Sequence, residues 1–154
     1  MDAIQKRHAE LPGMVADLYW LNKFLNVPPN LELVIPDTPP SMNHYVVHTR
    51  WSHYKTDASV AYQELVKRVF RDNQLTNRWL SVPIPVGVCI RLRIAPKTVM
   101  DVDNHAKVLN DALTGLVWDD DKQIQAMYIS KVIVTPERKQ RVRDVLQTTI
   151  KVWI

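Results

Sequence analysis

An α+β fold is predicted for this chain, with helices packed on a small mixed β-sheet. Short runs at 31–35 and 86–94 alternate apolar and polar side chains, which is the period of a half-buried strand. Segments at 57–71 and 104–115 instead repeat apolar residues at helical spacing. Because helices and strands intermix along 154 residues, we expect one domain with a shared core.

The N-terminal region is expected to be helical over 2–25, in two pieces divided by Pro12-Gly13. In the second piece, Leu18, Leu21 and Leu25 fall on one helix face. Pro28 and Pro29 then end the helix, because proline cannot continue one. We therefore predict that 1–29 is a helical extension, packed on the body or on a partner chain, and that 30–154 is the main domain.

The main domain opens with the strand at 31–35. Thr56 or Asp57 can cap the helix that follows, whose apolar stripe is predicted to be Ala58, Ala61, Leu65 and Val69, widened by Tyr62, Val66 and Phe70. After the strand at 86–94 comes the helix at 104–115, with Gly115 as its terminator. Further strands are predicted at 123–134 and 145–154, joined by a charged turn.

Charge is distributed unevenly in this basic protein, whose net charge is +4. Residues 101–121 hold six Asp and one Lys, a local charge of −5, so the remaining 19 basic and 10 acidic residues carry +9. A basic body around an acidic centre fits a protein that attracts a polyanion and holds a cation. The alternative is a chance cluster of solvated aspartates at helix ends.

Other features of the composition point to a cytoplasmic protein. There is no apolar run of the roughly 18 residues that span a bilayer, and no signal-peptide pattern at the N-terminus. The one cysteine, Cys89, excludes an internal disulfide framework and suits a reducing compartment. Cys89 lies in mid-strand and is expected to be buried packing rather than a nucleophile.

Two aspartates precede the helix at 104–115. If the backbone there is extended, Asp101 and Asp103 point the same way and can converge on one cation. Carboxylate oxygens suit Mg²⁺, Asn104 adds a neutral oxygen, and Lys107 follows four residues after Asp103, where it could hold a phosphate. Alternatively, both aspartates are ordinary helix caps. His105, in the same stretch, is expected to be exposed.

Three more aspartates, Asp119, Asp120 and Asp121, follow the helix, where the helix dipole disfavours negative charge. A helix of about twelve residues is ~18 Å long. The two acidic ends can share a metal ion only if the chain bends back or a second copy supplies one end. An antiparallel pair of helices in a two-fold dimer would build two composite sites, so we predict a homodimer.

The spaced pattern D-x-D-N-x-x-K-x-x-x-D-A-L-x-G followed by W-x-D-D-x-Q-I resembles the RusA family of Holliday junction resolvases. It runs here from Asp101 to Ile124, and Pro39-Pro40-Ser41-Met42-Asn43 is similar to the family's N-terminal P-P-S-x-N element. The resemblance covers residues 31–154. It implies a RusA-like fold and a homodimeric, Mg²⁺-dependent endonuclease that cuts four-way DNA junctions.

By the same resemblance, the essential carboxylates are Asp101, Asp103 and Asp121, with Asp120 as the alternative third ligand, and the active-site lysine is Lys107. Predicted DNA contacts are Asn43, His44, Arg50, His53, Lys55, Lys97 and Asn104. Two further basic groups could bind phosphates, namely Lys67, Arg68 and Arg71, and then Arg138, Lys139, Arg141 and Arg143. Nuclease action on other branched DNA, and DNA binding without catalysis, remain open alternatives.

Overall fold

The computed structural model of this chain describes residues 13–41, 46–48, 50, 53–73, 84–96 and 101–154. A four-stranded mixed sheet has the order β1 (Leu31–Ile35), β6 (Gln147–Trp153), β4 (Val86–Ile94) and β5 (Ile124–Ile133). β4 and β5 run parallel, and the other two pairings are antiparallel. The predicted α+β fold is therefore confirmed.

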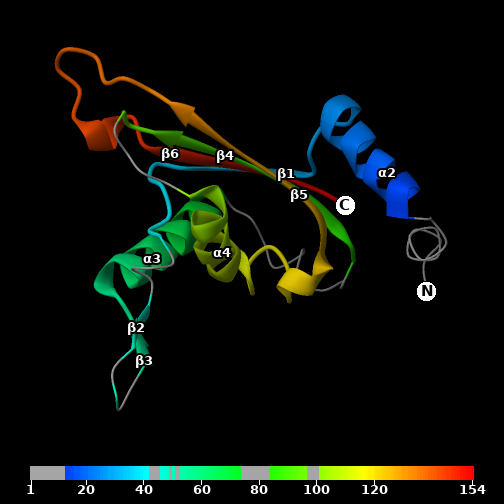
Figure 1. Cartoon of the computed structure of the whole chain (residues 1–154), viewed down its shortest axis with the longest axis horizontal. Coiled ribbons are helices and arrows are strands. Elements are labelled where there is room, and N and C mark those ends of the chain that lie inside the picture. The colour runs from blue at the N-terminus through cyan, green and yellow to red at the C-terminus, as the bar shows by residue number, and fades with distance from the viewer. Residues whose placement is uncertain (1–12, 42–45, 49, 51–52, 74–83, 97–100) are drawn as a thin grey trace.

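Helices lie on both faces of this sheet (Figure 1). α3 (Asp57–Asp72) and α4 (Val102–Leu113) cover one face, and α2 (Gly13–Asn26) lies on the other. A separate hairpin of β2 (Val46–His48) and β3 (His53–Lys55) projects away from the sheet. None of the helices within the described ranges is long and apolar enough to cross a bilayer, and the cytoplasmic location stays a prediction.

The core lies between the sheet and the α3–α4 layer. Alternate residues of β4, among them Val88, Ile90 and Leu92, are buried against this layer. Leu109 of α4 and Trp118 after it are fully buried in the same cluster. The alternation predicted for 31–35 and 86–94 is confirmed, because each strand turns every second side chain into this core.

α3 begins as predicted, with Thr56 as its N-cap, whose hydroxyl oxygen accepts a hydrogen bond from the Ser59 N–H at 3.3 Å. The predicted apolar stripe was confirmed at Tyr62, Val66 and Phe70 and wrong at Ala58 and Ala61. Ala58 and Ala61 are exposed, and the buried residues are Ser59, Tyr62, Val66 and Phe70. The larger side chains decide the rotation of the helix, because their burial removes more apolar area from water.

α4 begins and ends two residues earlier than predicted. The helix starts after Asp101 and stops at Leu113. Gly115 lies beyond the end with φ +81°, a conformation that favours glycine, and its N–H donates to the Trp118 carbonyl at 2.7 Å. β4, α4 and β5 thus form one parallel βαβ unit.

The sheet has two ends that matter for the site. At the loop end, defined by Ile35, Ile94 and Gln147, β1 and β4 finish and β6 begins. At the acidic-turn end, defined by Val86 and Ile124, β4 and β5 begin. α4 follows β4 and leads back to β5, so it runs from the loop end to the acidic-turn end.

α2 packs on the sheet face opposite α3 and α4. Trp20 is buried over Gly87 of β4, and Phe24 contacts the Trp153 ring with 4.9 Å between centroids. The Trp153 indole N–H donates to the Val27 carbonyl at 2.8 Å, which ties the end of α2 to β6. The chain after α2 is therefore held against the acidic-turn end of the sheet.

The apolar face predicted for this helix does not make that contact. Leu18, Leu21 and Leu25 are 60%, 52% and 74% exposed, because the aromatic side chains of the neighbouring face bury more area against the sheet. The first predicted helical piece, 2–11, lies outside the described residues. The division at residue 29 stays a prediction.

The contact of α2 with Gly87 predicts a specific sensitivity. A Cβ at residue 87 would lie 2.6 Å from Cζ3 of Trp20 and 2.7 Å from Cε1 of Phe24. Gly87→Ala should therefore lower the free energy of unfolding by roughly 1–3 kcal/mol, as overpacked cores do. Urea denaturation measures this cost. In a Trp20→Ala background the same substitution should cost less, and an equal cost in both backgrounds would show that Trp20 is not the obstacle.

Candidate active site

The first acidic group lies at the start of α4. Asp101 occupies the N-cap position with an extended backbone, yet its side chain makes no capping hydrogen bond. Its exposed carboxylate is therefore not engaged in holding the helix. Asp101 is therefore an N-cap by position, as the helix-cap alternative expects, but its side chain makes no capping hydrogen bond.

Asp103 differs from the expectation in its backbone. It is the second residue of α4 rather than part of an extended segment, so the predicted strand-like alignment with Asp101 was wrong. Asp103 is exposed in the first helical turn, where the helix dipole stabilises a negative charge. Two exposed carboxylates thus remain together at this helix terminus.

Lys107 follows Asp103 by one helical turn and shares its exposed side of α4. None of the ion pairs found among the described residues involves its ammonium group. Asn104 is half-buried in the first turn. The start of α4 therefore presents two carboxylates and an ammonium group that the described part of the chain does not neutralise.

The second acidic group is held by the turn after α4. Trp118 is fully buried, and its indole N–H donates to the Thr114 hydroxyl at 3.1 Å. With the reversal at Gly115, this bond fixes where the chain leaves the core. Asp119, Asp120 and Asp121 follow at once and are all exposed. The buried Trp118 thus anchors the chain directly before three adjacent, exposed carboxylates.

Gln123 organises these three aspartates. Its amide oxygen accepts the backbone N–H groups of Asp119 and Asp120 at 2.8 and 3.2 Å, and its amide nitrogen donates to the Ile84 carbonyl at 3.0 Å. The W-x-D-D-x-Q pattern is therefore a structural unit: the tryptophan anchors one end of the acidic turn and the glutamine the other.

Asp120 and Asp121 have different roles in this turn. Asp120 is the N-cap of a short 3₁₀ helix (Asp121–Gln123), where its carboxylate accepts the Lys122 N–H at 2.9 Å. That hydrogen bond is the main reason why the pKa of Asp120 lies below its ordinary value. Asp121 is the next residue, and capping is not its role. This difference favours Asp121 as the third carboxylate, although either choice remains a prediction.

One chain does not bring the two acidic groups together. Among the described residues, no set of three His, Cys, Asp or Glu side chains is placed to hold a metal ion. α4 has 12 residues and is therefore ~18 Å long. β4, which precedes α4 in the chain, extends ~26 Å from Val86 to Ile94. Asp101 and Asp103 belong to one end of this unit and Asp121 to the other.

Residues predicted to bind DNA are described in part. Asn43, His44 and Lys97 lie outside the described residues. Arg50 is exposed between β2 and β3, and His53 opens β3. Lys55 closes the hairpin and donates to the Gln63 amide oxygen at 3.2 Å. On α3, Lys67 forms an exposed ion pair with Glu64 at 2.8 Å, which contributes little to stability.

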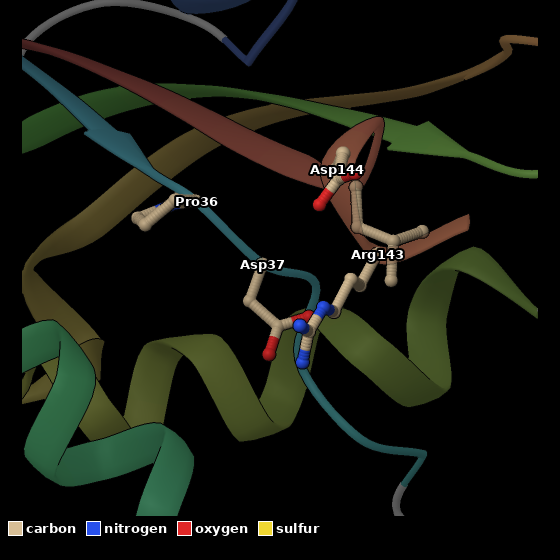
Figure 2. Close-up of a pocket in the computed structure, with 5 residues that line it drawn as sticks. Pro36, Asp37, Arg143 and Asp144 are labelled. Atoms are coloured by element: carbon tan, nitrogen blue, oxygen red, sulfur yellow. The ribbon is translucent and has the colours of Figure 1, made fainter. Parts of the chain in front are cut away.

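The second basic cluster lies between β5 and β6, at the loop end. Arg141 pairs with Asp144 at 3.4 Å, so its charge is partly balanced within the chain. Arg143 instead lines a cavity of about 360 Å³ together with Pro36 and Asp37, and Figure 2 shows its side chain extending toward Asp37. The predicted catalytic carboxylates are not among the residues that line this cavity.

His105 was predicted to be exposed, and this was wrong. It is only 7% exposed, and its Nδ1 lies 2.5 Å from the Pro39 carbonyl oxygen. Sequence reasoning missed it because a polar residue in a charged stretch resembles a surface position. Its burial could have been predicted from its spacing, because His105 lies four residues before the buried Leu109 and therefore on the same face of the helix.

Cys89 is half-buried on β4, and burial raises the pKa of its thiol to about 11. The thiol therefore stays protonated at neutral pH. Because the thiolate is the nucleophilic form, this agrees with the expectation that Cys89 is not a nucleophile.

Comparison with known proteins identifies the family. The family model for endodeoxyribonuclease RusA matches residues 36–143. The crossover junction endodeoxyribonuclease RusA of Escherichia coli strain K12 is 31% identical over 98 residues, which cover 63% of this chain and 79% of the relative. The protein of the same name from Enterobacteria phage 82 matches with the same identity and coverage.

The matched residues begin directly after β1 and include α3, β4, α4 and the acidic turn, so they contain both acidic groups of the site. α2 precedes the matched segment. On the strength of a match that covers most of its length, this chain belongs to the RusA family of endodeoxyribonucleases.

Proposed function

We propose that this protein is a Mg²⁺-dependent endonuclease that resolves four-way DNA junctions by phosphodiester hydrolysis, in recombination or repair. The observation that carries the proposal is the start of α4. There Asp101, Asp103 and Lys107 are exposed without ion pairs in the described part of a RusA-family chain. The names of its relatives supply the class of substrate, a crossover junction.

A homodimer would complete the site. The donor set fits Mg²⁺, which prefers carboxylate oxygens, but each end of α4 offers only part of it. In a two-fold pair with the α4 helices antiparallel, Asp121 of the partner subunit would lie beside Asp101 and Asp103. Two equivalent sites would result, which suits symmetric cutting of a junction with two-fold symmetry.

The chain's own groups would divide the work of hydrolysis. Asp101, Asp103 and Asp121 of the partner subunit would hold the metal ion. When bound, Mg²⁺ lowers the pKa of a coordinated water and polarises the phosphate. Lys107, one turn along α4, would stabilise the negative charge that develops on the phosphate oxygens. No covalent enzyme intermediate is required, in agreement with a protonated Cys89 thiol.

DNA would approach the loop end of the sheet. The β2–β3 hairpin follows β1, and the start of α4 follows β4; both of these strands end there. The cluster that contains Arg143 leads into β6, which begins there. Basic side chains on these loops would contact phosphates without reading sequence. The same end therefore combines DNA affinity with two of the three carboxylates.

Cleavage of a synthetic four-way junction tests the proposed activity. The wild-type protein should cut the junction in the presence of Mg²⁺ and leave linear duplex of the same sequence intact. Asp103→Asn and Asp121→Asn should each reduce the cleavage rate by more than about a hundredfold, while junction binding in Ca²⁺ is kept. Gel electrophoresis of end-labelled arms measures both quantities.

Asp120→Asn is the matched control, because Asn is also a good N-cap and should keep the acidic turn in place. Its cleavage rate should stay within about threefold of wild type. Loss of activity in Asp120→Asn with normal activity in Asp121→Asn would assign the third ligand to Asp120. Equal cutting of junction, flap and duplex would contradict the proposed substrate.

Mixing variants tests the shared site. A heterodimer of Asp103→Asn and Asp121→Asn has one site with both changes and one site with neither. After subunit exchange, nicking should recover to about a quarter of the wild-type rate, because half of the dimers are mixed and each has one intact site. A mixture of Asp101→Asn and Asp103→Asn is the control and should recover nothing. Absence of recovery in both mixtures would contradict a composite site.

A further inference from the structure

We infer that His105 is a positioning residue that aligns the DNA-contact hairpin with the catalytic start of α4, a role that rests on the proposed function. Its ring Nδ1 and the Pro39 carbonyl oxygen are 2.5 Å apart, and both residues are buried. Because a carbonyl oxygen only accepts, the Nδ1 atom must carry the hydrogen. The bond therefore selects a ring with its hydrogen on Nδ1.

The segment after β1 needs a donor from elsewhere. Pro36, Pro39 and Pro40 have no N–H groups, so few backbone donors remain in this segment, and the Thr38 N–H already donates to the Asp37 carboxylate at 2.8 Å. Two side chains from other elements supply further donors. The Thr148 hydroxyl of β6 donates to the Asp37 carbonyl at 2.7 Å, and the His105 ring donates to Pro39. An apolar side chain at residue 105 would leave the Pro39 carbonyl buried without its partner, which is costly.

His105 also lies on the side of α4 that fixes the rotation of the helix. With Leu109 and Ala112 it forms the buried face, whereas Asp103 and Lys107 lie on the exposed face. The hydrogen bond to Pro39 is thus at the same helical turn as the predicted metal ligand and phosphate ligand. It connects that turn to the segment that leads into β2 and β3.

This bond therefore ties the start of α4 to Pro39, in the chain between β1 and the hairpin. The hairpin would hold the DNA, and α4 would hold the metal ion. If the bond is lost, each element can still bind its own ligand, but the scissile phosphate and the metal-bound water are no longer held in register. Small errors of alignment lower the rate of the chemical step strongly. The expected signature is a slower chemical step with unchanged binding of DNA and Mg²⁺.

Two substitutions of similar size separate this role from simple packing. His105→Leu removes the donor, and His105→Asn keeps an amide N–H close to the position of Nδ1. In His105→Leu, the single-turnover cleavage rate at saturating Mg²⁺ should fall about tenfold. The dissociation constant for the junction in Ca²⁺ should stay within about twofold of wild type. The Mg²⁺ concentration that gives half of the maximal cleavage rate should also stay within about twofold of wild type. His105→Asn should regain most of the rate.

A second measurement does not depend on activity. In the wild-type protein at neutral pH, ¹⁵N NMR of labelled histidine should show that His105 carries its hydrogen on Nδ1. A hydrogen on Nε2 alone would overturn the inference. The inference would also be overturned if His105→Leu cut as fast as wild type, or if His105→Asn lost as much of the cleavage rate as His105→Leu. A third contrary result would be a His105→Leu variant whose DNA affinity fell in proportion to its cleavage rate.

The outcomes for the proposed function are distinct. A wild-type protein that cuts no junction overturns the proposed function and the positioning role together. A wild-type protein that cuts, with His105→Leu equally active, overturns the positioning role alone. Urea denaturation of each variant checks that equal fractions are folded in the assay.

Discussion

The length of α4 is the constraint on which the site depends. Twelve residues of regular helix place Asp101 and Asp103 ~18 Å from the chain that leads to Asp121. The helix cannot shorten, because Leu109 and Leu113 hold it to the core and Gly115 and Trp118 fix its exit. The parallel pairing of β4 with β5 keeps the two ends apart in the same way. For this reason the proposed site takes its third carboxylate from a second subunit.

The same βαβ unit is the reason why we propose that DNA approaches the loop end. α4 starts there, the β2–β3 hairpin is reached from the end of β1, and the cluster with Arg143 precedes β6. The acidic-turn end has a different environment, with α2 packed over Gly87 and tied to β6 through Trp153. In a dimer of the proposed kind, each subunit would offer a DNA-binding end and donate its acidic turn to the other.

Much of this fold was predictable from sequence, because alternation and helical spacing report which side chains face a core. The strands at 31–35 and 86–94 and the Thr56 cap were confirmed. The predicted face of α2 was wrong, and that of α3 was confirmed only at Tyr62, Val66 and Phe70, because competition among apolar side chains is settled by tertiary packing. His105 was missed for the same reason: its partner, Pro39, is 66 residues away. The motif predicted which carboxylates form the site, which stays a prediction, but only the structure separated the capping role of Asp120 from Asp121.

The most direct measurement is a crystal structure of the protein with Mn²⁺, with the ion located by its anomalous scattering. We expect each ion to be bound by Asp101 and Asp103 of one subunit and by Asp121 of the partner subunit, with two equivalent sites per dimer. An ion bound by carboxylates of one subunit alone, or no ion near Asp103, would contradict the shared site.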